Sequence, residues 1–364
     1  MKAAIFLGPN QPLEIGEIEL GDPGPREVVI RTAFAGICHS DLHFIEGKFP
    51  MPAPAVLGHE SSGIVESVGS DVSYVEPGDH VITCLSVFCG ICEHCLSGFP
   101  NRCGGRATDR PKGSPPRLSR NGDPVQQFAH LSSFAEKMLV HENAIVKIRK
   151  DMPLDRAALI GCGVTTGVGA VLRTADVEPG STVVVIGCGG IGLAAINGAA
   201  IASAGRIIAI DRLQGKLELA KRFGATHVID ASEQDPVEAV RELVGRRGVD
   251  YSFEAIGLKE TAEQAWAMLG VGGTATIIGM VPLGIKIEVP GYELLQEKKL
   301  QGSMMGSNRF RTDMPMLVDF YLAGKLELDA MISSRIKLDE INQAMDALKT
   351  GEVARQVIVF DGVN

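Results

Sequence analysis

Four cysteines lie close together in the segment CGICEHCLSGFPNRC. They follow the spacing C-x2-C-x2-C-x7-C and are Cys89, Cys92, Cys95 and Cys103. A redox pair, a disulfide knot and chance are the competing interpretations. A redox pair needs one C-x-x-C at a helix start near a βαβ unit, whereas this cluster lies upstream of any such unit. Four thiolates suit tetrahedral Zn²⁺ and leave no position open for a substrate. The spacing therefore favours a structural zinc site.

A second set of Cys and His residues could hold a catalytic metal. The candidates are Cys38, His39, His43, His59 and Cys162. A catalytic zinc needs two or three protein ligands of these types and one open position. The segment GHESSG is not the HExxH motif of zinc proteases, because Gly63 stands where the second histidine belongs. The two remaining cysteines, Cys84 and Cys188, lie in apolar or glycine-rich surroundings and are expected to be packing residues.

A glycine-rich turn between a buried strand and a helix predicts a dinucleotide site. Residues 187–192, GCGGIG, match G-x-G-x-x-G, with Asp211 at the end of the next strand. Gly187 permits the tight turn, Gly189 lets the backbone approach a pyrophosphate, and Gly192 lets helix and strand pack closely. Asp211 would accept hydrogen bonds from the ribose hydroxyls and repel a 2′-phosphate, which favours NAD, although Arg212 could accommodate that phosphate. The alternative is a βαβ turn that binds nothing.

The elements around these motifs change character along the chain. Up to about residue 160, short β-rich runs alternate with turn clusters, and 106–130 is expected to be a long surface loop. From about residue 180, strands alternate with helices, which indicates a parallel sheet. After about residue 305, two helical segments precede a closing strand, RQVIVF.

Length, charge and hydrophobicity limit which binding partners and which cellular location the sequence predicts. The chain has 364 residues, a net charge of −9 and 45% hydrophobic residues, so two globular domains are expected. The acidic balance argues against nucleic acid or an anionic membrane as a partner. The N-terminal apolar run is too short for a signal peptide, and no run approaches the length of a membrane helix. We therefore expect a cytoplasmic location, where reduced thiols favour metal binding over disulfides.

Taken together, GHESSGIVESVG, CHSD with His43, the four-cysteine lobe, and GCGGIG with Asp211 resemble the zinc-dependent medium-chain alcohol dehydrogenases. The resemblance covers nearly the whole chain. It implies an α/β architecture with a GroES-like β-rich catalytic domain over 1–163 and 305–364 and a zinc lobe at 84–105. A Rossmann domain, a doubly wound parallel sheet, would occupy 164–304. It further implies two zinc ions per chain, NAD, a small-molecule alcohol or aldehyde as substrate, and a homodimer or homotetramer.

The same resemblance implies roles for individual residues. Cys38, His59 and Cys162 would bind the catalytic zinc, with Glu60 nearby, and Asp41 would orient His59. Ser40 and His43 would relay the proton. The cofactor would contact the following residues: His39, Thr166, Gly187, Gly189, Gly190, Ile191, Gly192, Asp211, Arg212, Lys216 and Arg355. The substrate pocket would include Ser40, Leu85, Phe134 and Met304, with Met305 as a further candidate.

The expected reaction is reversible hydride transfer between a primary medium-chain or aromatic alcohol and NAD, giving an aldehyde and NADH. The nearest alternative is glutathione-dependent formaldehyde dehydrogenase. That branch places acids before the GHE motif, where this chain has only Glu46 with Lys48 close by, and has an anion-binding arginine one position from Arg106. A zinc-lobe binding module without catalysis would need a basic helix. A zinc-free quinone reductase on the same scaffold would lack the Cys38, His59 and Cys162 set.

Overall fold

The structure is a computed structural model that describes residues 1–104, 106–351 and 354–362 and divides into two compact units. The first unit contains Met1–Cys162, Arg309–Ala323 and Ile332–Asn364, and the second contains Gly163–Asn308 and Gly324–Met331. Residues 163, 305–308 and 324–331, which the sequence assigned to the catalytic domain, belong to the second unit. In this respect the limits differ from the expected domain boundaries. Gly105 of the expected zinc lobe lies outside the described residues.

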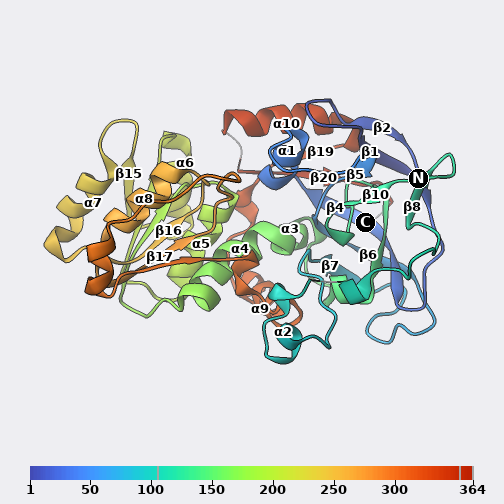
Figure 1. Ribbon diagram of the computed structural model, residues 1–364, viewed down its shortest axis with the longest axis horizontal. Helices are drawn as coiled ribbons and strands as arrows, with labels where there is room; N and C mark the ends of the chain where they lie inside the picture. The colour runs from blue at the N-terminus through green and yellow to red at the C-terminus, as the bar shows by residue number, and fades with distance from the viewer. Residues whose placement is uncertain (105, 352–353, 363–364) are drawn as a thin grey trace. The chain divides into compact units, whose positions relative to one another are not determined.

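The first unit is built on mainly antiparallel sheets, in which β19 with β20 and β5 with β10 are parallel pairs. Its largest sheet has the order β12-β7-β6-β4-β20-β19, with β11 also paired to β4, and its four-stranded sheet has the order β10-β5-β1-β2. The strands are β1 (Lys2–Phe6), β2 (Glu14–Glu17), β3 (Glu19–Leu20), β4 (Glu27–Gly36), β5 (Ala55–Val56), β6 (Glu60–Val68), β7 (His80–Thr83), β8 (Leu118–Arg120), β9 (Asp123–Pro124), β10 (Gln126–Gln127), β11 (Lys137–His141), β12 (Ile145–Ile148), β19 (Ile332–Ile336) and β20 (Arg355–Val359). In Figure 1 the red β20 lies beside the blue β4, so both ends of the chain build one sheet.

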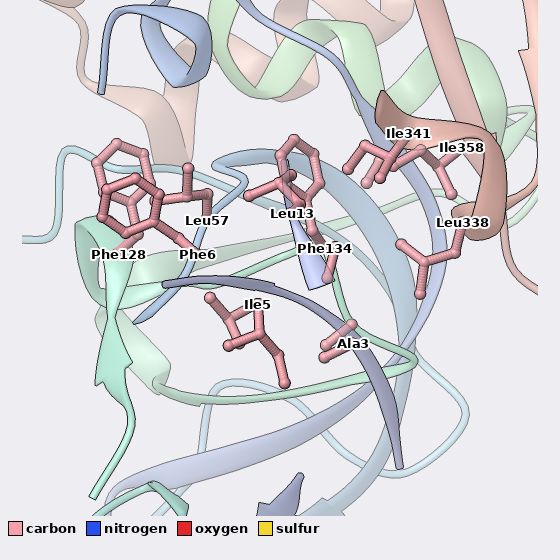
Figure 2. Close-up of a cluster of buried hydrophobic side chains, with 14 of the residues drawn as sticks. Ala3, Ile5, Phe6, Leu13, Leu57, Phe128, Phe134, Leu338, Ile341 and Ile358 are labelled. Atoms are coloured by element: carbon pink, nitrogen blue, oxygen red, sulfur yellow. The ribbon is translucent and has the colours of Figure 1, made fainter. Parts of the chain in front are cut away.

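Buried apolar side chains from both ends of the chain form the core of this unit (Figure 2). In β1, the run AAIF is fully buried, as expected of a strand covered on both faces. Phe6, Leu57 and Phe134 pack in one cluster with Ile341 and Ile358 near the carboxyl end. The α-helices of the unit are α1 (His39–Ile45), α2 (Glu93–Leu96), α3 (Leu154–Leu159), α9 (Phe310–Leu322) and α10 (Ile341–Thr350).

The expectation of a long loop at 106–130 was wrong in part, because the segment contains the strands β8, β9 and β10. Ion pairs with the buried carboxylate of Glu27 also fix the segment to the first unit. The carboxylate of Glu27, at the start of β4, is only 4% exposed. It accepts hydrogen bonds from Arg110 Nη2 at 2.5 Å, Arg117 Nε at 2.7 Å and the backbone amide of Gly24 at 2.7 Å. Burial raises the pKa of Glu27, but hydrogen bonds from Arg110, Gly24 and Arg117 outweigh it and lower the pKa to about 2.

The second unit is a parallel sheet with the strand order β15-β14-β13-β16-β17-β18. The chain starts in the middle of the sheet with β13 and adds β14 and β15 on one side. It then returns to the middle and adds β16, β17 and β18 on the other side. The direction of strand addition therefore reverses between β13 and β16, which is the topological switch point. The alternation expected from the sequence is confirmed. The strands are β13 (Thr182–Ile186), β14 (Arg206–Asp211), β15 (His227–Asp230), β16 (Val249–Glu254), β17 (Leu269–Ile277) and β18 (Lys299–Gly302), and the helices are α4 (Thr165–Gly169), α5 (Gly190–Ile201), α6 (Gln214–Arg222), α7 (Pro236–Val244) and α8 (Lys259–Ala267).

Both faces of this parallel sheet are covered. Val184 and Ile186 of β13 pack in one core with Val240 of α7 and Trp266 of α8. The side chain of Val185, which points to the opposite face, is equally buried. This arrangement explains why the sequence STVVVIG is continuously apolar instead of alternating.

One helical stretch, Leu154–Ala175, is long and apolar enough to cross a membrane by length and composition. The sequence did not predict it, since no apolar run there is uninterrupted. In its most apolar window 78% of the residues are buried inside the molecule. The stretch therefore has the burial of a core helix.

Candidate active site and cofactor site

The four clustered cysteines form a closed set of sulfur ligands. Their Sγ atoms all lie within 4.8 Å of one another, and none is in a disulfide. Three of the separations are 3.9 Å for Cys89–Cys95, 3.5 Å for Cys92–Cys95 and 3.7 Å for Cys92–Cys103. A tetrahedron with Zn–S bonds of about 2.3 Å has S···S edges of about 3.8 Å. The spacing of the sulfurs therefore fits one zinc ion.

The charges of the cluster also call for a cation. The backbone amides of Ile91 and Cys92 donate to Cys89 Sγ at 3.5 and 3.3 Å. The pKa of Cys89 is lowered to about 6, with the amide of Ile91 as the largest cause, whereas burial raises the pKa of Cys95 to about 12. Four sulfurs at these distances cannot all ionise unless a metal ion compensates their charge.

A second set brings Cys38, His59 and Cys162 together, and all three side chains are buried. Cys38 is the N-cap of α1, His59 directly precedes β6, and Cys162 lies in the π-helical turn η5 (Ile160–Val164). Their ligand atoms all lie within 4.8 Å of one another. Three residues from separate parts of the sequence therefore meet at one place in the first unit, as the resemblance implied.

The orientation of His59 fits a metal ligand. Its Nδ1 lies 3.2 Å from Asp41 Oδ1, which also accepts the Gly58 amide at 3.0 Å. Its Nε2 is buried and, within the described part of the chain, has no hydrogen-bond partner. Metal-bound imidazoles have this arrangement, with one nitrogen on a carboxylate and the other on the metal. Three ligands of the Cys2His type fit a zinc ion that keeps one position open.

Glu60 and Arg355 form a buried charged pair beside this set. Arg355 Nη2 lies 3.8 Å from Glu60 Oε2, and Nη1 donates to Ile37 O at 3.2 Å. The hydrogen bond from Cys162, followed by the charge of Arg355, lowers the pKa of Cys38 well below its usual value. Arg355 was expected among the cofactor contacts. The structure places it within a buried network next to Glu60, where it favours the thiolate form of Cys38.

The two residues of the expected proton relay lie on α1. Ser40 Oγ is 3.7 Å from Cys38 Sγ. The ring of His43 stacks on Phe49 with centroids 6.1 Å apart. Burial, and then the positive charge of Lys48, lower the pKa of His43. A neutral imidazole at this position can accept a proton near neutral pH.

An aromatic residue that the sequence interpretation missed, Phe128, lies against the metal set. Its ring meets the ring of His59 edge-on at 5.7 Å and that of Phe44 at 4.8 Å. Phe134, the expected pocket residue, is fully buried in the core cluster to which Phe128 and Leu57 also belong. The segment QQFAHLSSF offers two phenylalanines, and its pattern does not tell which one faces the metal. Of the other expected pocket residues, Leu85 is half-buried and Met304 is exposed.

The glycine turn of the second unit has the geometry of a dinucleotide site. Gly187 has φ +94° and donates to Ile210 O at 2.8 Å. A Cβ on Gly192 would collide with Gly187 O, whereas one on Gly189 would meet open space. The backbone at Gly189 is therefore accessible just before α5 begins at Gly190, where the positive end of the helix dipole favours an anion.

The carboxylate of Asp211 is hydrogen-bonded to this glycine turn. Its Oδ2 accepts the Cys188 amide at 2.8 Å, and its Oδ1 accepts the Arg212 amide at 2.8 Å. Lys216 is half-buried, and Thr166 is buried with its Oγ1 3.3 Å from Met305 Sδ. The expected cofactor residue His39 is exposed on α1 of the first unit. Cys188 is fully buried, in agreement with a packing role.

Comparisons with known proteins agree with this geometry. Residues 24–150 match the alcohol dehydrogenase GroES-like domain, and residues 190–321 match the zinc-binding dehydrogenase family. An S-(hydroxymethyl)glutathione dehydrogenase from Photobacterium damsela subsp. piscicida is 39% identical over 372 residues, covering 99% of both chains. A protein of that name from Escherichia coli O1:K1 / APEC is similar to the same extent, 39% over 99% of both chains.

Two solved structures are similar over 99% of both chains. The alcohol dehydrogenase zinc-binding domain protein from Burkholderia ambifaria has a TM-score of 0.94 at 34% identity. Benzyl alcohol dehydrogenase from Acinetobacter calcoaceticus has a TM-score of 0.92 at 35% identity. The expected fold class, a GroES-like domain with a Rossmann sheet, is confirmed, as are zinc and NAD as the cofactors of such enzymes. With both metal sets and the dinucleotide turn in place, the chain belongs to the zinc-dependent medium-chain alcohol dehydrogenase family of oxidoreductases.

Proposed function

We propose that this enzyme transfers hydride between a primary alcohol, medium-chain or aromatic, and NAD, giving an aldehyde and NADH without glutathione. The observation that carries the proposal is a series of aromatic side chains that reaches the metal set through the buried ring of Phe128. Phe44, Phe49 and Phe128 contact one another in series, and Phe128 contacts His59. Apolar walls with a few polar groups are typical of pockets for small apolar substrates.

Three ligands would hold the catalytic zinc: Cys38, His59 and Cys162. When bound, zinc supplies a Lewis acid that lowers the pKa of a coordinated hydroxyl. The Ser40 hydroxyl would accept the alcohol's proton and pass it toward His43, whose lowered pKa keeps it neutral and able to receive it. Asp41 would hold the ring of His59 in one orientation through Nδ1.

Glutathione-dependent formaldehyde oxidation is the second candidate, and the names of the 39% identical relatives favour it. An S-hydroxymethyl adduct of glutathione carries an ammonium group that must be held at the pocket mouth. Among residues 44–58, Glu46 is the only acid, and it pairs with Lys48 at 2.7 Å. A carboxylate already neutralised by lysine is a weak anchor for an ammonium group, and this supports the alcohol over the adduct.

We further propose a homodimer or homotetramer, a cytoplasmic location, and no nucleic acid or membrane partner. Several large apolar side chains of the second unit are exposed in a short stretch around η8 (Gly291–Gln296): Leu283, Ile285, Tyr292, Leu294, Leu295 and Leu300. Apolar surface of this kind is typical of protein–protein contacts. The nearby strand β18 has one unpaired edge in the described sheet, which another copy can cover.

The test is initial NADH formation with benzyl alcohol or hexanol, compared with formaldehyde plus glutathione at matched concentrations. We expect efficient oxidation of the alcohols and little NADH from the glutathione mixture. A clear preference for the mixture would overturn the proposal and would make Arg106, exposed in the 106–130 segment, a candidate substrate anchor. No turnover of either substrate would favour a zinc-lobe binding module.

A further inference from the structure

A fully buried carboxylate lies beside the dinucleotide turn and has no role in the proposed reaction. It belongs to Glu254, the last residue of β16, which is 0% exposed. In the pairing of β16 with β13, Glu254 is opposite Ile186, the residue directly before Gly187. Glu254 therefore lies at the carboxyl edge of the sheet, at the switch point where ligands of such folds bind.

One oxygen of this carboxylate organises the turn that follows β16. Oε1 accepts three hydrogen bonds, from the Ile256 amide at 2.8 Å, the Gly257 amide at 2.7 Å and Thr261 Oγ1 at 2.8 Å. Gly257 has φ +95°, a conformation that side chains other than glycine rarely adopt. The turn is thus held from inside by a single acceptor atom.

Glu254 also joins this turn to the turn after β17. Its backbone oxygen accepts the amides of Ile278 at 2.8 Å and Gly279 at 3.0 Å. A Cβ on Gly257 would lie 2.7 Å from Met280 O, so the two turns are in close contact. Both turns therefore depend on the position of one residue.

The turn carries Ile256 toward the glycine motif. Ile256 is 45% exposed, and a Cβ on Gly187 would lie 2.5 Å from its Cγ1. The side chain of Ile256 therefore stands against the first glycine of the dinucleotide turn and presents an apolar surface there. In the same region, the backbone at Gly189 is open.

The second carboxylate oxygen of Glu254 lowers the stability of the folded protein. Oε2 is buried and has no hydrogen-bond partner in the part of the chain that the structure describes. A Cβ on Gly279 would lie 2.5 Å from it, so the backbone closes around the group. Leaving a carboxylate oxygen buried and unpaired destabilises the fold, and such groups in native proteins call for a functional explanation.

We propose that Glu254 is a positioning residue for the nicotinamide cofactor. Through Oε1 it fixes the 255–257 turn, so that Ile256 forms one rigid apolar wall of the dinucleotide crevice beside Gly187. The residue acts through Ile256 and does not itself touch the cofactor. The inference rests on NAD as the cofactor of this chain, and its experiment separates the two ideas.

Three variants test the role of the acceptor atom. Glu254→Met keeps the volume and removes the acceptor, whereas Glu254→Gln keeps an oxygen that can accept the same three hydrogen bonds. Ser252→Ala is the matched control, because Ser252 is fully buried in the same strand and loses one hydrogen bond, to Ala265 O at 2.7 Å. For each holoenzyme one measures the Kd of NADH by fluorescence titration, the KM of NAD and of the alcohol, and the melting temperature.

Glu254→Met is expected to raise the Kd of NADH about tenfold, which corresponds to about 1.4 kcal/mol, and to leave the KM of the alcohol unchanged. Glu254→Gln should stay within about threefold of wild type. Ser252→Ala should lower the melting temperature without changing the Kd. Should Glu254→Met fail to fold, Ile256→Ala, which leaves the acceptor in place, should raise the Kd of NADH about fivefold.

The inference is overturned if Glu254→Met melts at a lower temperature but binds NADH as tightly as wild type does. It is equally overturned if Glu254→Gln is as impaired as Glu254→Met, because the charge and not the acceptor would then matter. An unchanged Kd in Ile256→Ala also overturns it. If wild-type protein itself binds no NADH, the cofactor assignment fails instead.

Discussion

Replacing Glu27 by glutamine should destabilise the first unit and release the 106–130 segment. The carboxylate is buried at the start of β4 and binds the guanidinium groups of Arg110 and Arg117. Glutamine keeps the size of the side chain and removes its charge. Breaking a buried ion pair from one side leaves the remaining charges without compensation, which is more costly than losing a surface pair.

The pKa of Glu27 gives the magnitude. A fall from 4.5 to about 2 in the folded protein corresponds to about 3.4 kcal/mol of stability near neutral pH. The variant should lose less than this, because Arg110 still donates to Pro115 O and Arg117 still donates to Thr108 O. We therefore expect Glu27→Gln to lower the free energy of unfolding by about 2–3 kcal/mol at pH 7.

The pH dependence has a definite sign. A carboxylate whose pKa is lowered by folding stabilises the protein above the unfolded pKa, and this stability is lost as the pH falls through 4.5 toward 2. At pH 3 less than half of the contribution should remain. The difference between wild type and Glu27→Gln should therefore shrink as the pH is lowered from 7 to 3.

The assay is urea unfolding followed by circular dichroism at several pH values, with limited proteolysis to report cleavage within 106–130. Glu66→Gln is the control, because the exposed pair of Glu66 with Lys137 at 2.6 Å should contribute less than about 1 kcal/mol. A loss below about 1 kcal/mol in Glu27→Gln, or a difference that stays constant down to pH 3, would refute the reasoning.

Three further outcomes are expected. Cys95→Ala should reduce the zinc content from about two ions per chain to about one and lower the melting temperature, since a structural zinc contributes to folding directly; unchanged zinc by mass spectrometry would exclude the closed site. Wild type should prefer NAD to NADP, and Asp211→Gly should narrow that gap in kcat/KM; equal rates with both cofactors in wild type would contradict the role of Asp211. A protonated His43 cannot accept a proton, so the rate of alcohol oxidation should fall as the pH drops through the pKa of His43, which burial and Lys48 hold below 6.5. Lys48→Gln should move this fall in rate to higher pH, and His43→Ala should remove it from the pH–rate profile.

Motifs that are local in sequence were the most predictable parts of this chain. The four cysteine ligands lie between residues 89 and 103, so spacing alone constrains how they meet, and the structure brings their sulfurs together as expected. The glycine turn is equally local. Strand, turn and helix follow one another, and the positive φ of Gly187 is what the motif requires. The alternating strands and helices of the second unit follow from the same kind of short-range pattern.

The three expected ligands of the catalytic zinc could not be predicted from local motifs in the same way. Cys38, His59 and Cys162 are separated by long stretches of chain, and each residue taken singly fits packing as well as ligation. The resemblance grouped them, and only the tertiary structure shows their ligand atoms within 4.8 Å of one another. Phe128 was missed for the same reason, since its contact with His59 depends on how the 106–130 segment returns to the core.

Glu27 and Glu254 show which physical information a single sequence lacks. Both are glutamates at a strand end, a place where a sequence pattern favours an exposed side chain, and both are buried. Their burial becomes possible because donors surround them: two arginines of the distant 106–130 segment for Glu27, and for Glu254 the amides of a turn whose conformation the sequence does not reveal. The number of hydrogen-bond donors around each carboxylate decides whether its replacement should change stability or cofactor binding. Glu27 is well satisfied and should act on stability, whereas Glu254 retains a buried unpaired oxygen next to the dinucleotide turn and should act on cofactor binding.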